Sequence, residues 1–474
     1  MMVKVMGLEA DLAGTRPGHV HLVGIGGAGM SAIAWVLLGR HYTVSGSDLQ
    51  ANALTDDLAA AGATIYVGHA AANIAGADTV VISSAVPATN PELVAARAAG
   101  VPILKRADFL GQLMAGNVGI AVAGTHGKTT TTGMIAQILL TAGRDPSVIV
   151  GGVLPALGRN GRAGQGAPFV IEADEYDYMF LGLQPRIAVV TNVEHDHPDI
   201  FATPEAYLDA FRLFVDRLPA GGRMVACADD AGVQSLLAQV RPDIQVTTYG
   251  LTAGADLLAL EAQSNVLGGT DFVAQAGPDL LGLVRLRVPG EHNVRNALAA
   301  LAVAEHLEVP FADVGEALAA FGGVSRRFQL IGQVGDIVVI DDYAHHPTEI
   351  RATLAAARQQ FPGRRLWAVW QPHTFSRTRL LLEAFAASFD DADRVVVLDI
   401  YRSREQDSLG VSAADVVARM EHPHARYVGR REEAAAYVLD RARPGDVILT
   451  LGAGDGNMVG QWVLDGLREA FNRS

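Results

Sequence analysis

The sequence has little cysteine and a deficit of positive charge. Cys227 is the only cysteine among 474 residues, which excludes an intrachain disulfide and any metal site built from several cysteines. This usage is typical of a reducing cytosol, so we expect a cytoplasmic protein. Lys and Arg number 37 against 51 Asp and Glu, giving a net charge of −14. Because nonspecific binding to nucleic acid or anionic membranes needs basic surface, neither is an expected partner.

We also expect no segment for export or membrane insertion. The first 18 residues lack the apolar core and cleavage site of a signal peptide. Residues 22–39 are uncharged and long enough to raise the question of a membrane span. Glycines near the start of this stretch favour a strand, a turn and a helix instead, so we expect no transmembrane segment. At 474 residues, 50% hydrophobic, the chain is long enough for about three domains.

Residues 118–142 carry the clearest chemical signal. An apolar strand leads into a glycine turn, and a lysine and four threonines then open an uncharged helix. The turn and the residues after it are Gly124, Thr125, His126, Gly127, Lys128, Thr129 and Thr130. Backbone N–H groups and the helix start converge there on anionic oxygens, and a threonine hydroxyl can hold Mg²⁺. Val122 replaces the first glycine of the strict P-loop pattern, so this is a variant nucleotide-binding loop, with a bare turn as the alternative.

A second glycine turn lies near the start of the chain. Residues 19–25 are a predicted strand and residues 26–38 a helix, and Gly24, Gly26 and Gly29 satisfy G-x-G-x-x-G. Asp48 follows the next strand, where a ribose would lie. The turn predicts a diphosphate, from a sugar nucleotide or from NAD, and a turn without a ligand stays open. Ser83 and Ser84 lie at the end of a later predicted strand. They could contact the ligand, or they could serve only as turn and cap residues.

Acidic and histidine clusters follow two strands of the central region. The predicted strand at 168–173 contains Glu172 near its end and leads into further carboxylates. Such carboxylates suit Mg²⁺ near a triphosphate, although a solvated acidic turn would have the same sequence pattern. After the strand at 187–191 come two histidines and three acids, among them His197. This cluster could hold a second metal, position a nucleophile or accept protons.

Further on, Asn293 and Asn296 share one face at a helix start. Their amide groups suit an adenine edge, unless Asn293 only caps the helix.

The last third predicts a hairpin at 328–334 and 337–340 and then a second doubly wound sheet. One strand end carries Asp342, Tyr343 and His346, and another carries His373 and Arg377. Arginines at such an edge are natural carboxylate clamps, although solvated arginine is the ordinary alternative.

Taken together, these motifs resemble the Mur ligases over essentially the whole chain. The motifs are HLVGIGGAGMSAIA, AGTHGKTTT, EADEYD, TNVEHDH, GEHNVRN, RRFQ, DDYAHHPTEI and QPHTFSRTR, in the family's order. The resemblance implies an α/β protein of three domains. Residues 1–117 would be a Rossmann-like UDP-sugar-binding domain, residues 118–326 a P-loop ATPase-type domain with a parallel or mixed sheet, and residues 327–474 a Rossmann-like domain that closes over ATP and brings in the amino acid.

The family also implies roles for site residues. Catalytic roles fall to Lys128, His197, Arg327 and His346. ATP would contact residues 124–130 together with His292, Asn293, Asn296, Arg327 and Asp342. The UDP-sugar would contact Gly24, Gly26, Gly27, Gly29, Asp48, Ser83 and Ser84. The amino acid would contact Tyr343, His373 and Arg377. Thr129 and Glu172 would form a first Mg²⁺ site, and His197 would belong to a second.

Within the family, the chain is most similar to the branch that joins L-alanine to the lactyl carboxylate of UDP-N-acetylmuramate, a step in peptidoglycan precursor synthesis. This implies ATP and Mg²⁺ as cofactors and a monomer or weak homodimer. The absence of lysine from residues 201–216 fits that branch. Two places depart from its pattern, namely Thr374, where an arginine is usual, and residues 401–405. A dehydrogenase, a P-loop switch and a ligase for another amino acid are the competing functions.

Overall fold

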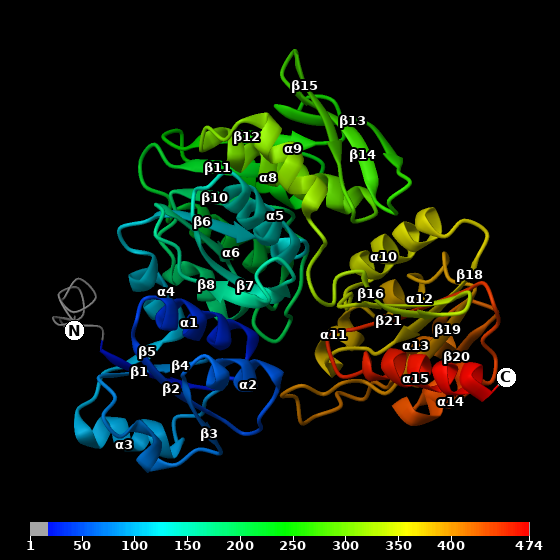
Figure 1. Ribbon diagram of the computed structural model, residues 1–474, viewed down its shortest axis with the longest axis horizontal. Helices are drawn as coiled ribbons and strands as arrows, with labels where there is room; N and C mark the ends of the chain where they lie inside the picture. The colour runs from blue at the N-terminus through cyan, green and yellow to red at the C-terminus, as the bar shows by residue number, and fades with distance from the viewer. Residues whose placement is uncertain (1–17, 474) are drawn as a thin grey trace.

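Three α/β units follow one another along the chain, each built around its own sheet (Figure 1). The computed structural model describes residues 18–473. The expectation about a signal peptide therefore falls almost entirely outside the described residues. Within them, no helix has the length and apolar character needed to cross a membrane. The predicted three-part α/β architecture is confirmed.

The first sheet has five parallel strands in the order β3-β2-β1-β4-β5. The order reverses at β1, so β1 and β4 flank the switch point at which such sheets bind ligands. The strands are β1 His19–Val23, β2 Thr43–Asp48, β3 Thr64–Val67, β4 Thr79–Ile82 and β5 Ile103–Lys105. The helices are α1 Ala28–Gly39, α2 Ala53–Ala60, η1 Ala71–Ile74, α3 Pro91–Ala99 and α4 Arg106–Met114.

The central sheet has ten strands in the order β15-β14-β13-β12-β11-β10-β6-β9-β7-β8. It is parallel from β13 to β7 and antiparallel at both ends. The strands are β6 Val118–Ala123, β7 Ser147–Leu154, β8 Arg159–Arg162, β9 Pro168–Glu172, β10 Ile187–Val190, β11 Arg223–Cys227, β12 Gln245–Gly250, β13 Leu257–Ser264, β14 Thr270–Ala276 and β15 Asp279–Arg285. The helices are α5 Lys128–Thr141, η2 Tyr176–Gly182, α6 Pro204–Val215, α7 Ala231–Leu237, α8 Glu291–His306 and α9 Phe311–Ala320.

The third sheet has six strands in the order β16-β17-β21-β18-β19-β20, and β16 alone of these runs antiparallel to its neighbour. The predicted hairpin is β16–β17. The strands are β16 Gln329–Val334, β17 Ile337–Asp342, β18 Arg365–Trp370, β19 Arg394–Leu398, β20 Ala425–Gly429 and β21 Asp446–Leu451. The helices are α10 Pro347–Gln360, α11 Phe375–Leu380, α12 Leu382–Ala386, α13 Ala413–Arg419, α14 Arg431–Leu439 and α15 Met458–Arg473.

The apolar run of β6 is buried on both faces. Ala121 and Ala123 belong to one hydrophobic cluster, and Ile120 and Val122 to another, as the two-residue period of a strand requires. The first of these clusters also holds Ile33 of α1, so the first unit and one face of the central sheet share a core. Since burial of apolar surface contributes roughly 25 cal/mol per Å², this shared core fixes the first unit against the central one.

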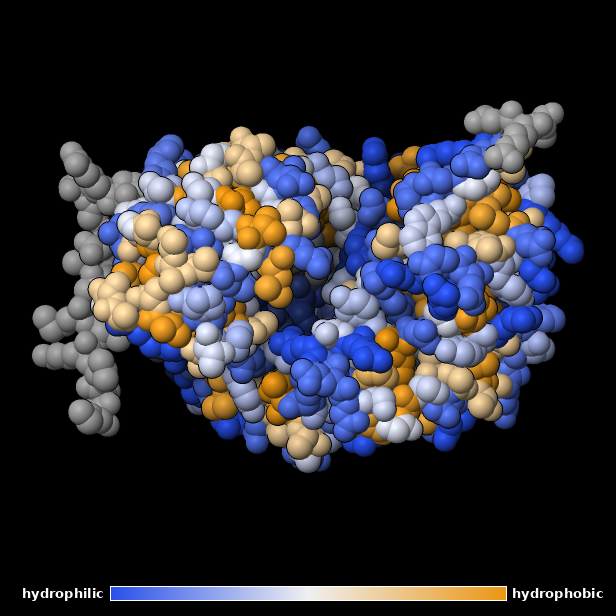
Figure 2. Space-filling view, turned by 90° about the horizontal axis from the view of Figure 1, so that it is seen from below, coloured by the Kyte–Doolittle hydropathy of each residue, from blue (hydrophilic) through white to orange (hydrophobic). Residues whose placement is uncertain are grey.

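The third unit is joined differently. Its two hydrophobic clusters contain only residues from position 328 onward, as far as the described chain shows. Several of its contacts with the central unit are polar pairs around a hollow, such as Arg377 with Asp196 at 2.8 Å. Figure 2 shows this hollow between the two halves of the molecule, lined by hydrophilic residues.

Candidate active site

The turn after β6 has the backbone that the sequence motif predicts. Gly124 and Gly127 have positive φ angles of 140° and 81°. A Cβ atom on Gly124 would lie 1.9 Å from the Thr191 hydroxyl oxygen, and one on Gly127 would lie 2.6 Å from Asn296 Oδ1. Both positions therefore require glycine. Helix α5 begins directly after Gly127 with no acidic residue in its first turn, so its free N–H groups face an open anion site.

Lys128 lies at this helix start, opposite a buried carboxylate. Its Nζ is 2.8 Å from Glu175 Oε2 and donates to the Thr125 carbonyl at 3.1 Å. Burial disfavours the ammonium charge, but Glu175 and Asp174 outweigh burial and raise the pKa of Lys128. The lysine is thus held as a cation beside the turn, the state that a phosphate group requires.

Thr129 and Glu172 come together as the metal prediction requires. The Thr129 hydroxyl donates to Glu172 Oε1 at 2.9 Å, and Gly151 N donates to Oε2 at 2.6 Å. Burial raises the pKa of Glu172 and outweighs these bonds and the charges of Lys128 and Arg327. A hydroxyl and a carboxylate are oxygen donors of the kind that a hard ion such as Mg²⁺ prefers.

His197 lies close to the phosphate-binding cradle, which is the turn of residues 124–127 together with the start of α5. Its Nε2 is 3.7 Å from Glu175 Oε1 and 3.7 Å from Asp196 Oδ2, and its ring meets Tyr176 edge-on at 5.0 Å. His197 lines a cavity of about 430 Å³ that also borders Lys128 and Glu172. The three predicted residues therefore share one space.

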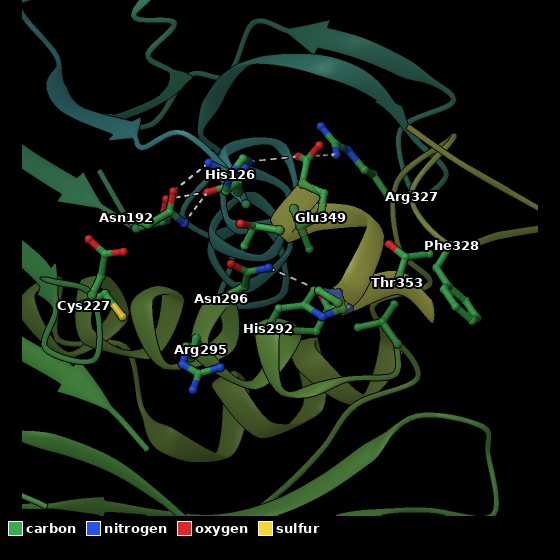
Figure 3. A pocket seen from close by; sticks show the side chains of 18 of the residues that line it. His126, Asn192, Cys227, His292, Arg295, Asn296, Arg327, Phe328, Glu349 and Thr353 are labelled. Atoms are coloured by element: carbon green, nitrogen blue, oxygen red, sulfur yellow. Dashed lines mark hydrogen bonds and ion pairs between the residues drawn. The ribbon is translucent and has the colours of Figure 1, made fainter. Parts of the chain in front are cut away.

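A second cavity, of about 330 Å³, contains the predicted adenine residues (Figure 3). Asn296 Nδ2 donates to Asn293 Oδ1 at 3.2 Å, and Asn293 Nδ2 donates to the Pro289 carbonyl at 2.8 Å. Desolvation of His292, its half-buried neighbour on α8, lowers the pKa of the ring to about 4 and keeps it neutral. The same cavity borders Gly127 and Thr130 of the cradle, so a nucleotide base and its phosphates fit one continuous site.

His126 connects the central unit to the third unit. Its Nε2 lies 2.9 Å from Glu194, and its Nδ1 lies 3.3 Å from Glu349 of α10 (Figure 3). Glu349 also pairs with Arg327 at 3.4 Å. Burial opposes the charge on His126, but Glu349 and Glu194 raise its pKa to about 9, so the ring is an imidazolium that bridges two carboxylates.

Arg327 and Asp342 face the nucleotide cavity from the third unit. The Asp342 carboxylate accepts from Phe328 N and Ala344 N, each at 2.7 Å. Burial raises its pKa to about 6. Arg327 keeps its charge because Glu349 and Asp342 outweigh burial and raise its pKa.

The two histidines of the AHHP motif point to different places. His345, which the sequence analysis left out, lines the cavity around Lys128 and donates from Nδ1 to the Tyr343 carbonyl at 2.9 Å. His346 does not line that cavity; it is 2% exposed and caps α10 by accepting from Thr348 N. The catalytic role predicted for His346 therefore lacks the expected position.

Arg377 is engaged by a carboxylate of the protein itself. Its Nε and Nη2 donate to the two oxygens of Asp196 at 2.8 and 3.0 Å, and both side chains are buried. Its Nη1 contacts His373 Nδ1 at 3.0 Å. The fork predicted to clamp the amino acid thus holds the third unit against the central one and orients His373.

The first unit adds its glycine turn to this arrangement. Gly24, Gly27, Gly29, Ser83 and Ser84 border a cavity of about 350 Å³ that reaches His197 and the third unit. Gly26 and Asp48 lie outside that lining, where Asp48 Oδ2 accepts from Gly26 N at 2.9 Å. Asp48 thus braces the turn here.

Comparisons with known proteins bear on this site. Residues 19–117 match the model of the "Mur ligase family, catalytic domain", residues 122–304 the "Mur ligase middle domain", and residues 326–454 the "Mur ligase, glutamate ligase domain". The chain belongs to the Mur ligase family. The UDP-N-acetylmuramate–L-alanine ligase of Geotalea daltonii is 46% identical over 455 residues, which are 95% of this chain and 98% of that protein. The enzyme of the same name from a Roseiflexus strain is 47% identical over 472 residues, 95% of this chain and 99% of its own length.

Solved structures of this family share the fold. The UDP-N-acetylmuramate–alanine ligase of Thermotoga maritima superposes with a TM-score of 0.81 at 30% identity, over 96% of this chain and 100% of that one. A murein peptide ligase of Psychrobacter arcticus gives a TM-score of 0.72 at 28% identity, over 95% of this chain and 98% of its own.

Sequence reasoning missed several residues that line the site. Glu349 pairs with Arg327, the Tyr176 ring packs on His197, and Asp196 pairs with Arg377, which lies 181 positions away in the chain. The Glu at the fourth position of HPTE was a usable signal for Glu349, because a glutamate at that position typically closes a capping box, as it does here with His346.

Proposed function

We propose that this Mur ligase is an ATP-dependent enzyme that joins L-alanine to the lactyl carboxylate of UDP-N-acetylmuramate. The products are the amide, ADP and phosphate, and the reaction belongs to peptidoglycan precursor synthesis. The observation that carries the proposal is the cavity in which Lys128 and Glu172 of the central unit meet Tyr343 and His373 of the third unit. The likeness to the alanine-adding relatives over 95% of the chain supports the same substrates.

The chemistry proceeds in two steps. A lactyl carboxylate oxygen attacks the terminal phosphorus of ATP, the bond to the bridging oxygen breaks, and ADP leaves an acyl phosphate. The free amine of L-alanine then attacks the acyl carbon, phosphate departs with the carboxylate oxygen, and the amine loses a proton. Both steps gather negative charge, which preorganised donors stabilise.

The residues divide the work by position. We assign Lys128 and the N–H groups at the start of α5 to the transferring phosphoryl group, and Arg327 to the phosphates from the third unit. Asn293 and Asn296 would bind the adenine, and Asp342 the ribose. Thr129 and Glu172 would hold a first Mg²⁺ and His197 a second, which would supply charge neutralisation at the phosphates.

His345 and His373 line the end of the cavity where the amine must arrive. Burial lowers the pKa of His345 to about 3 and that of His373 to about 2, so both rings are neutral at pH 7. His345 Nδ1–H donates a hydrogen bond to the Tyr343 carbonyl, which leaves Nε2 as an acceptor for the alanine ammonium or amine. We propose this orienting role for His345 in place of the role first expected of His346.

The finer assignments are part of the same proposal. The domain limits are residues 1–117, 118–326 and 327–474, with UDP held at the glycine turn of the first domain. The single cysteine supports a cytoplasmic location. A monomer or weak homodimer is part of the proposal.

An omission experiment tests the function. Phosphate release is measured with ATP and Mg²⁺, with and without UDP-N-acetylmuramate, and with each of a panel of amino acids. The proposal predicts release that needs both the sugar nucleotide and L-alanine. Release that ignores both would favour a P-loop switch, and tight NADH binding without ATP turnover would favour a dehydrogenase. Release with another amino acid would place the chain in a sister branch.

A further inference from the structure

One cavity between the first and third units contains three arginines, Arg106, Arg377 and Arg404. Arg106 pairs with Asp174 at 3.0 Å. The Arg377 guanidinium donates to both carboxylate oxygens of Asp196. Two of the three guanidinium groups therefore already have carboxylate partners.

Arg404 differs from both. Within residues 18–473 it has no carboxylate partner, and its guanidinium carbon lies 4.4 Å from the centre of the Tyr176 ring. The Tyr176 hydroxyl donates to Asp199 at 3.0 Å, which fixes the ring that Arg404 covers. A stacked guanidinium keeps its in-plane N–H donors available, so Arg404 offers its fork to an anion in this cavity.

The segment that carries Arg404 is anchored to the third unit. Tyr401 N donates to the Pro372 carbonyl at 2.8 Å, and Thr374 N donates to the Tyr401 carbonyl at 3.0 Å. The Glu405 carboxylate accepts from Ser376 N at 3.2 Å and from the Ser376 hydroxyl. The two stretches that depart from the family pattern, Thr374 and residues 401–405, thus lie against each other.

A short series of contacts connects Arg404 with Lys128, the residue that we assign to the transferring phosphoryl group. Arg404 covers Tyr176, the Tyr176 ring meets His197 at 5.0 Å, and His197 lies 3.7 Å from Glu175. Glu175 pairs with Lys128 at 2.8 Å. An α-amino acid carries its carboxylate and its amine on one carbon. A carboxylate on Arg404 therefore places the amine near His373, which lines both this cavity and the cavity that holds Lys128.

We infer that Arg404 binds the carboxylate of the incoming amino acid, the role for which the fork of Arg377 is not free. This inference rests on the proposed ligase function. The guanidinium fork matches the two oxygens of a carboxylate, and Tyr176 holds the fork in place before the substrate arrives.

The test compares L-alanine with L-alaninamide, which lacks the carboxylate charge. In the wild type, kcat/KM favours L-alanine. Arg404→Ala is expected to lower this preference at least ~10-fold, the scale of one charge-assisted hydrogen-bond pair, mainly through the KM for L-alanine. The KM values for ATP and UDP-N-acetylmuramate stay within about twofold of the wild type on this account.

Two further variants complete the design. Arg402→Ala is the matched control, because Arg402 is exposed in the same segment and borders a different cavity. Arg404→Lys keeps the charge without the fork and is expected to fall between Ala and wild type. It also keeps the test decisive if Arg404→Ala fails to fold.

Several outcomes would overturn the inference. An unchanged preference for L-alanine over L-alaninamide in both Arg404 variants is one. A raised KM for UDP-N-acetylmuramate with an unchanged KM for L-alanine is another, and it would assign Arg404 to the diphosphate. A wild-type enzyme without alanine-dependent phosphate release would overturn the proposed function itself, which is a separate result.

Discussion

His126 is expected to make the stability of this protein depend on pH. The imidazolium lies between Glu194 at 2.9 Å and Glu349 at 3.3 Å and so joins the central unit to α10 by charge. Replacing His126 by glutamine removes the charge but keeps one side-chain donor. The variant therefore leaves two carboxylates close together without the cation between them.

The size and sign of the effect follow from the pKa. Histidine in an unfolded chain has a pKa near 6.5, and the two carboxylates, opposed by burial, raise the pKa of His126 to about 9. A raised pKa gives stability that is fully present below pH 6.5 and is lost as the pH rises through about 9. At 1.36 kcal/mol per pKa unit, the charge contributes roughly 3 kcal/mol at pH 6 and almost nothing at pH 9.5.

Urea unfolding at these two pH values measures the effect. His126→Gln is expected to lower the free energy of unfolding by roughly 3 kcal/mol at pH 6 and by less than ~1 kcal/mol at pH 9.5. His306→Gln is the control, because burial lowers the pKa of His306 to about 4 and its ring is neutral at both values. A His126→Gln deficit that is equal at pH 6 and pH 9.5 would refute the reasoning.

Three other variants test the site. Lys128→Ala is expected to lower turnover at least ~100-fold in the phosphate-release assay with an unchanged circular dichroism spectrum, and near-normal turnover would remove its cradle role. Glu172→Gln should raise the Mg²⁺ concentration for half-maximal rate at least ~10-fold, and an unchanged Mg²⁺ titration would exclude Glu172 as a ligand. Asp196→Asn leaves the buried Arg377 charge unpaired and should cost ~3–5 kcal/mol in urea unfolding, most of which the double variant Asp196→Leu/Arg377→Met recovers; a double variant as unstable as the single one would count against the pairing.

The sequence predicted the cradle well because its parts are contiguous. A strand, two glycines with positive φ, a lysine and a threonine occupy one stretch, and each residue type has a local physical reason. The glycine turn of the first unit was predictable for the same reason. The ligand of this turn could not be predicted, because a turn that binds a diphosphate has the same sequence whether the diphosphate belongs to a sugar nucleotide or to NAD.

Pairings across the chain were beyond the reach of local patterns. Arg377 and Asp196 are 181 positions apart, and only the packed domains bring them together. Adjacent residues on extended backbone point in opposite directions, so the sequence could not decide between His345 and His346. The edge strand β20, whose residues are mostly half-buried or exposed, also lacked the apolar run that marks the inner strands.

The central claim is that a carboxylate is activated by phosphorylation before the amine attacks it. The most direct test uses UDP-N-acetylmuramate labelled with ¹⁸O in its lactyl carboxylate, with ATP, Mg²⁺ and L-alanine, and follows the released phosphate by mass spectrometry. An acyl phosphate passes one labelled oxygen to each phosphate when the amine displaces it. We therefore predict one ¹⁸O atom per phosphate, whereas phosphate released without label would contradict the account.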